Sequence, residues 1–229
     1  PPGFHPMGLD SAVLTRFEEL AILSQPLVAA DAQRVTLFDD IGAGGGVLGS
    51  VPAIAGSGVY VATAAGLVDD DGADELVVVR RGAGGSLDVL TIEPEAAGAY
   101  AVAHSFNIPS AGFTYGDTQL VLADVDGDFR DEYLFATRDQ TVDETASAGW
   151  VRIYDDNVDG NGLLHDLPLT GLNSPAGLDH IELAAGDLDG DGRDEIGVLA
   201  LRRVGSSRTV RIQVFEQEGG AFVNRIPWG

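Results

Sequence analysis

The sequence predicts an all-β protein, a β-propeller made of four-stranded antiparallel blades. The first observation is an internal repeat, in which an acidic pair followed by an apolar run recurs at Glu18-Glu19, Asp74-Glu75, Asp131-Glu132 and Asp194-Glu195. An apolar residue before proline and an alternating segment keep the same spacing, about 57–60 residues, which is in the range of propeller and array repeats. The second observation is a content of 31 glycines in 229 residues, which favours many turns and short strands.

The last copy shows how each unit divides into four strands. Residues 180–187 form the first expected strand, and an acidic turn leads into a second at 195–203. The second is almost continuously apolar, which suits a strand buried on both faces. The third, at 209–217, alternates with period two, and the fourth is expected at 221–227. No window predicts a helix of ten residues or more.

The repeats give one propeller region over the whole chain, with units at about 1–53, 54–110, 111–169 and 170–229. A blade buries its faces against its neighbours, so no unit is expected to be stable alone. A stack of sheets or a β-sandwich is the structural alternative.

Composition excludes several classes of function. The formal net charge is −23, from 36 acidic and 13 basic residues, and every basic residue is Arg. Nucleic acids and anionic membranes are therefore not expected as partners, because phosphate binding needs a basic surface. The chain has no Cys, which excludes disulfides, thiolate catalysis and Cys-bound metals. No apolar run reaches the ~18 residues of a membrane span, so no membrane insertion is expected.

The acidic residues gather in three nine-residue turns, at 67–75, 124–132 and 187–195. These turns hold 15 of the 36 acidic residues. Clustering of this kind favours cation sites over the alternative, an acid-rich surface from a source adapted to high salt. Carboxylates at positions 1, 3 and 5 of a tight loop point toward one centre. A Gly at position 6 turns the chain, and a carbonyl at 7 and a carboxylate at 9 complete a set of oxygens that suits calcium.

The loops match this ligand pattern to different degrees. Leu67 cannot ligate from position 1 of its loop, and Phe129 stands where Gly is expected at position 6. The first unit has Ser11, Val13 and Thr15 at the ligand positions, which indicates a blade that has lost its metal.

The segments GDLDGDGRDEIGVLA (186–200) and ADVDGDFRDEYLFAT (123–137) resemble the FG-GAP/VCBS repeat family, which includes the integrin α-subunit propellers. The resemblance implies a calcium-binding blade of four strands, with two calcium sites and a third candidate. The implied ligands of the two sites are Asp187, Asp189, Asp191, the carbonyl of Arg193 and Glu195, and Asp124, Asp126, Asp128, the carbonyl of Arg130 and Glu132. The third candidate has Asp69, Asp71 and Glu75.

The resemblance also implies a ring of seven or eight blades. Four units would then be part of a larger ring, completed by further repeats or by a second copy of the chain.

A further acidic turn follows the third alternating segment. Asp155, Asn157 and Asp159, with Gly160 and Asp166, mimic the spacing of an EF-type loop. Because no helices flank it, we interpret it as a solvated hairpin and keep a metal site as the alternative.

The expected function is that of a secreted or cell-surface module that binds calcium and a protein or glycan ligand in adhesion, without catalysis. The alternative is the propeller portion of a polysaccharide lyase or another carbohydrate-active enzyme. The sequence shows no nucleophile elbow and no phosphate-binding loop, so an enzyme is the second choice.

Overall fold

The structure is a computed structural model in which the described residues are 4–6, 20–26, 34–38, 47–50, 58–82, 84–94, 100–110, 115–139, 149–169, 178–204 and 206–226. Every regular element among them is a β-strand, so the all-β prediction is confirmed. No helix in this part of the chain is long and apolar enough to cross a membrane.

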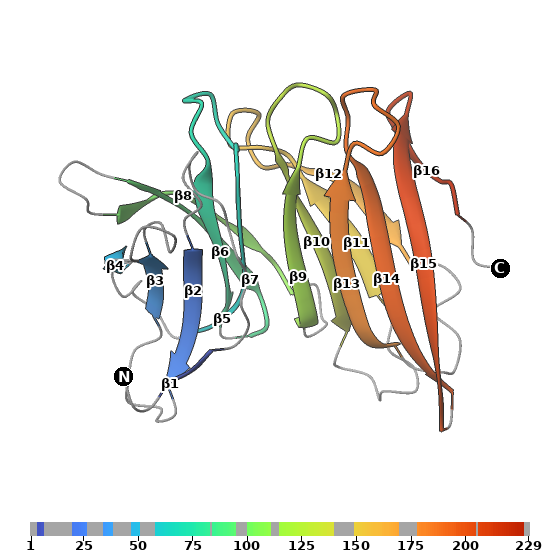
Figure 1. Cartoon of the computed structure of the whole chain (residues 1–229), viewed down its shortest axis with the longest axis horizontal. Helices are drawn as coiled ribbons and strands as arrows, with labels where there is room; N and C mark the ends of the chain where they lie inside the picture. Colours follow the sequence, from blue (N-terminus) through green and yellow to red (C-terminus); the bar gives the residue numbers. More distant parts are fainter. Residues whose placement is uncertain are drawn as a thin grey trace. The chain divides into compact units, whose positions relative to one another are not determined.

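The described residues form sixteen strands in four antiparallel sheets of four strands each, and Figure 1 labels the strands. In each sheet the strands lie in chain order, so each pair of neighbouring strands is joined by a hairpin. The first sheet has β1 (Phe4–Pro6), β2 (Leu20–Pro26), β3 (Arg34–Phe38) and β4 (Val47–Ser50). The second has β5 (Gly58–Gly66), β6 (Glu75–Gly82), β7 (Leu87–Pro94) and β8 (Tyr100–Ile108). The third has β9 (Tyr115–Ala123), β10 (Glu132–Asp139), β11 (Gly149–Tyr154) and β12 (Leu163–Pro168). The fourth has β13 (Leu178–Gly186), β14 (Glu195–Val204), β15 (Ser207–Glu218) and β16 (Ala221–Asn224).

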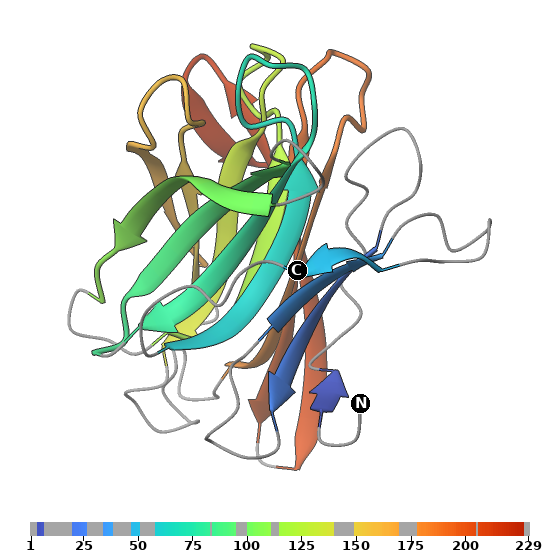
Figure 2. The same ribbon diagram turned by 90° about the vertical axis from the view of Figure 1, so that its left-hand side faces the viewer.

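The chain forms two compact units. The first comprises Pro1–Leu67 and Asp71–Pro109, and the second comprises Val68–Asp70 and Ser110–Gly229. In the first unit, Figure 2 shows β5–β8 side by side in one twisted sheet. Its strand β6 is buried on both faces, because Val77 and Val78, which point to opposite sides of the sheet, are both fully buried.

The second unit is built around two sheets packed face to face. Its core takes Leu134, Ala136, Val151 and Ile153 from one sheet and Ile181, Ile196, Val198, Ala200 and Phe215 from the other. In both sheets these side chains alternate along the strand, so one face of each sheet supplies the core. This packing fixes the β9–β10 loop and the β13–β14 loop, which carry the acidic residues, on a common scaffold.

The outer face of the fourth sheet differs from the prediction. The apolar run of β14 predicts burial on both faces, but among its described apolar side chains Ile196, Val198 and Ala200 are buried, whereas Leu199 and Leu201 are not. Leu199, which points the other way, is 36% exposed, and its partner on β15, Ile212, is 51% exposed. An apolar sheet face therefore lies open on this side of β14 and β15.

Candidate metal centre

Each acidic turn joins the first two strands of a sheet. The β5–β6, β9–β10 and β13–β14 loops all end on a glutamate, namely Glu75, Glu132 and Glu195. Each glutamate begins the second strand and pairs with the last residue of the first strand, so the sheet holds it at the base of its loop. The three are buried, with exposed fractions of 1%, 0% and 5%.

The first aspartate of the loop organises the turn. Asp124 accepts a hydrogen bond at Oδ1 from the Gly127 N–H, at 2.7 Å. Asp187 accepts the equivalent bond from the Gly190 N–H, at 2.6 Å. Short Asp side chains commonly bond backbone groups two or three residues ahead in this way, which explains why the Asp-rich sequence folds into a tight turn.

The buried glutamate closes the loop from the other side. Val125 donates its N–H to Oε2 of Glu132 at 2.8 Å, and Leu188 donates its N–H to Oε2 of Glu195 at 2.7 Å. The two loops are therefore built on the same hydrogen-bond pattern, as expected for copies of one unit.

Phe129 adopts the positive φ that was expected of a glycine at position 6 of the loop. Its φ is 72°, close to the 90° of Gly192 at the same place in the β13–β14 loop. Its N–H donates to Oδ2 of Asp124 at 2.9 Å, and Gly192 makes the same bond to Asp187 at 3.1 Å. The loop thus keeps its shape although Phe129 is strained there, and the ring is 82% exposed.

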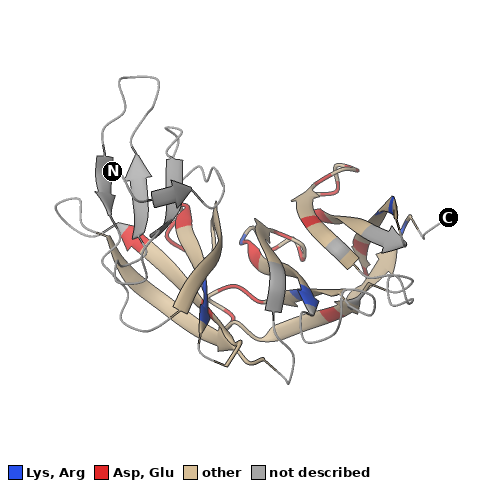
Figure 3. Ribbon diagram, turned by 90° about the horizontal axis from the view of Figure 1, so that it is seen from below, with Lys and Arg blue, Asp and Glu red and all other residues tan. Residues whose placement is uncertain are grey.

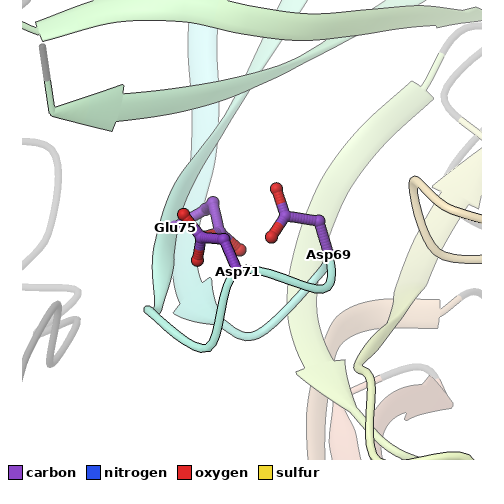
Figure 4. Close-up of side chains that lie close together, drawn as sticks. All are labelled: Asp69, Asp71 and Glu75. Carbon is purple, nitrogen blue, oxygen red and sulfur yellow. The ribbon is translucent and has the colours of Figure 1, made fainter.

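The carboxylates of each loop come together in groups that could hold a metal ion. In every group one oxygen of each member lies within 4.8 Å of the others. The β9–β10 loop contributes Asp124, Asp126 and Glu132, and the β13–β14 loop contributes Asp187, Asp189 and Glu195. The β5–β6 loop contributes Asp69, Asp71 and Glu75, shown in Figure 4. The structure therefore brings positions 1, 3 and 9 together in two loops, and positions 3, 5 and 9 in the other.

In the two best loops, the aspartate at the fifth position lies outside the acidic group formed by positions 1, 3 and 9. Asp128 is grouped with Asp156 and Asp159, and Asp191 belongs to none of the acidic groups among the described residues. Both side chains accept the N–H of the arginine two residues ahead, at 2.9 Å in each case. The carbonyl ligands at Arg130 and Arg193 stay predictions, and Ser11, Val13 and Thr15 lie outside the described residues.

The β11–β12 hairpin adds carboxylates that sequence reasoning interpreted as solvated. Asp155 and Asp156 form a group with Glu132, and Asp156 is fully buried. Asp155 and Asp159, which belong to the EF-type alternative, share none of the acidic groups among the described residues, and Asn157 accepts hydrogen bonds at Oδ1 from Tyr133 at 2.8 Å and from Asn161 at 3.0 Å. The predicted topology could have shown that this hairpin lies near the β9–β10 loop, because in a four-stranded meander the first and third hairpins lie at the same end of the sheet.

Arg130 places a guanidinium among these acids. It forms ion pairs with Asp128 and with the buried Asp156, and also with Asp70 and Asp159, each at 3.1 Å. These carboxylates raise the pKa of Arg130, mainly through its hydrogen bond to Asp156. The sequence predicted a role only for the carbonyl of Arg130, as a metal ligand, whereas its side chain connects three segments of the second unit.

Burial raises the pKa of three further acids in the loops and the hairpin. Burial raises the pKa of Glu132 to about 9, and the charges of Asp126 and Asp124 add to the increase. The hydrogen bond from Val125 lowers the pKa, but its effect is smaller than that of burial. Burial likewise raises the pKa of Glu195 and of Asp155. A cation at these carboxylates would stabilise the charged form that burial disfavours.

The β13–β14 loop rests directly on the β9–β10 loop. Asp194 donates its N–H to the carbonyl of Asp124 at 2.8 Å. The Arg193 side chain covers Gly127, where an added Cβ would lie 2.9 Å from its Nε. Figure 3 shows Asp and Glu in red along such loops, with few blue segments among them. The two loops therefore form one acidic, mutually supported surface.

The chemistry of the site is that of oxygen ligands. Among the described residues the groups contain only Asp and Glu, which suit hard divalent cations such as calcium or magnesium. A comparison with protein-family models finds no match for this chain, and a comparison with curated proteins finds none either.

Proposed function

We propose that this chain is a calcium-binding β-propeller module of the FG-GAP/VCBS type, secreted or exposed at the cell surface. It binds a protein or glycan ligand in adhesion and catalyses no reaction. One observation carries the proposal: the same hairpin of three sheets holds a group of two aspartates and a buried glutamate. A repeated cation site of this kind would stabilise each of these three blades at its loop end.

Calcium fits the groups better than magnesium does. Calcium accepts 6–8 oxygens in an irregular shell, whereas magnesium requires a strict octahedron and keeps several waters. The loops offer several carboxylates each, and the carbonyls predicted at position 7 would add to them. Calcium concentrations outside cells would fill sites of even modest affinity.

The propeller arrangement is supported by the sheets themselves. Each is a four-stranded meander, and in the second unit two successive sheets pack face to face. In the proposed ring, further repeats or a second copy of the chain would cover the open face at Leu199 and Ile212.

Metal counting tests the proposed cation sites. Native mass spectrometry in calcium should show one ion fewer for Asp126→Asn and one fewer for Asp189→Asn than for the unaltered chain. Asp159→Asn is the control, because its carboxylate is paired with Arg130 and belongs to neither loop group. Unchanged calcium content in both loop variants would overturn the proposal.

A glycan array combined with a lyase assay on uronic-acid polymers tests the non-catalytic function. Binding without turnover is the expected result. Turnover that depends on the acidic loops would favour the carbohydrate-active enzyme instead.

A further inference from the structure

Glu132 belongs to two acidic groups, whereas its counterparts belong to one each. It lies with Asp124 and Asp126 in its own loop, and with Asp155 and Asp156 of the β11–β12 hairpin. Glu195, at the same place in the next sheet, is grouped only with residues of its own loop among the described residues. Among the described residues, a second set of carboxylates therefore approaches the repeated glutamate only at the β9–β10 loop.

One oxygen of Glu132 lacks a hydrogen-bond partner in the part of the chain that the structure describes. Its Oε2 accepts the Val125 N–H at 2.8 Å, but its Oε1 is buried and has no hydrogen-bond partner among the described residues. The residue as a whole is 0% exposed. A buried carboxylate oxygen normally has a partner, since leaving it without one costs about 1–3 kcal/mol. An unpartnered buried oxygen within a group of acids indicates that a cation belongs there.

The nearby arginine does not fill this role. The ion pairs of Arg130 go to Asp70, Asp128, Asp156 and Asp159. They compensate part of the negative charge of the group formed by Asp128, Asp156 and Asp159, and they do not include Glu132 or Asp155. Asp156 still offers lone pairs to a second cation, because a carboxylate can accept about four interactions.

We propose that Glu132, Asp155 and Asp156 form a second cation site, shared between the β9–β10 loop and the β11–β12 hairpin, for a hard divalent cation. Glu132 bridges this site and the site of Asp124 and Asp126. The inference rests on the proposed cation binding and adds a site that the loop repeat does not contain. A cation at this shared site would link the third hairpin of the sheet to the first.

Calcium counting by native mass spectrometry on the full chain tests the shared site. Asp155→Asn should lose one ion, because within the described part of the chain Asp155 is grouped only with Glu132 and Asp156. Glu132→Gln should lose two ions, and Glu195→Gln, the matched control, should lose one. Melting curves without metal establish that each variant is folded, and Asp155→Asn provides the test if Glu132→Gln does not fold.

The outcomes separate this inference from the proposed function. Full calcium content in Asp155→Asn would overturn the shared site, as would the loss of a single ion in Glu132→Gln. Either result leaves the loop sites in place if Asp126→Asn and Asp189→Asn each lose one ion. Retention of every ion by these two loop variants would overturn the proposed function itself.

Discussion

Arg130 donates a hydrogen bond from Nε to Oδ2 of Asp156, so a guanidinium from the β9–β10 loop lies against the buried carboxylate of the β11–β12 hairpin. Asp156 is fully buried, and its Oδ1 also accepts the N–H groups of Val158 at 2.7 Å and of Asp159 at 2.8 Å. The hairpin is therefore organised around a charge that Arg130 compensates.

Removal of Arg130 should destabilise the metal-free protein strongly. In Arg130→Met, Asp156 would stay buried without its cationic partner, and an uncompensated buried charge is costly. The melting temperature should fall well below that of Arg225→Met, the control. Arg225 pairs with Glu216, but its side chain is 43% exposed, and exposed pairs contribute little. Equal melting temperatures for the two variants would contradict the structural role of Arg130.

Calcium should stabilise the fold. A ligand that binds only the folded state adds about 2.7 kcal/mol per site when its free concentration is 100 times its dissociation constant. Thermal melts with calcium and with a chelator should therefore differ, and the midpoint should rise with calcium concentration. An unchanged midpoint over the whole titration would contradict calcium binding by the native state.

The stability of the metal-free protein should fall as the pH rises. The pKa of Glu132 is about 9 in the folded protein, above its ordinary value of 4.5, because burial disfavours the charged form. The folded state therefore binds an additional proton between these pH values, and its stability decreases from about pH 4.5 toward 9. Urea unfolding at several pH values should show a weaker decrease for Glu132→Gln. Identical slopes would show that Glu132 has an ordinary pKa.

Calcium affinity should change with pH in the opposite direction. A metal ligand must lose its proton before it binds, so calcium binding should release protons and strengthen as the pH rises. Titration calorimetry in buffers of different ionisation enthalpy measures the release. Glu132→Gln should release fewer protons than the unaltered chain.

Gly127 should be less tolerant of a side chain than Gly190, although both occupy the fourth place of their loops. Their φ values are 87° and 84°, so alanine is strained at either position, by about 1–2 kcal/mol. At Gly127 the new Cβ would also lie 3.2 Å from Cγ of Arg193, whereas nothing lies within 4 Å at Gly190. Chemical denaturation should show the larger loss for Gly127→Ala. Equal losses would mean that the loops do not pack on each other.

The open face of the fourth sheet should drive association. Leu199 lies opposite Ile212, and Leu201 lies opposite Val210. The side chains of Ile212 and Val210 are 51% and 57% exposed. Light scattering on the 229-residue chain should show association, and Ile212→Glu should reduce it, because a charge disfavours burial of this face. A monodisperse, cooperatively melting monomer would contradict the larger ring.

Local spacing made much of the candidate site predictable. Asp124, Asp126 and Glu132 lie within nine residues of one hairpin, so a tight turn and one pair of strands suffice to bring them together. The same holds for the acids of the β13–β14 loop. The all-β class and the four-strand division followed from period-two alternation and from glycine-rich turns, which are also local signals.

Only the tertiary structure decided how the hairpins combine. The sequence predicts a solvated turn at Asp155 and a ligand role for the carbonyl of Arg130, because the partners that these residues meet, Glu132 and Asp156, lie far away along the chain. Asp155 and Asp156 meet Glu132 across the sheet, and Arg130 pairs with Asp156 instead of water. The register of β10 on β11 sets these distances, and it depends on side-chain packing along the whole strand pair. Spacing along the chain therefore determined each loop, while the packing of strands against one another determined which charges face each other between the loops.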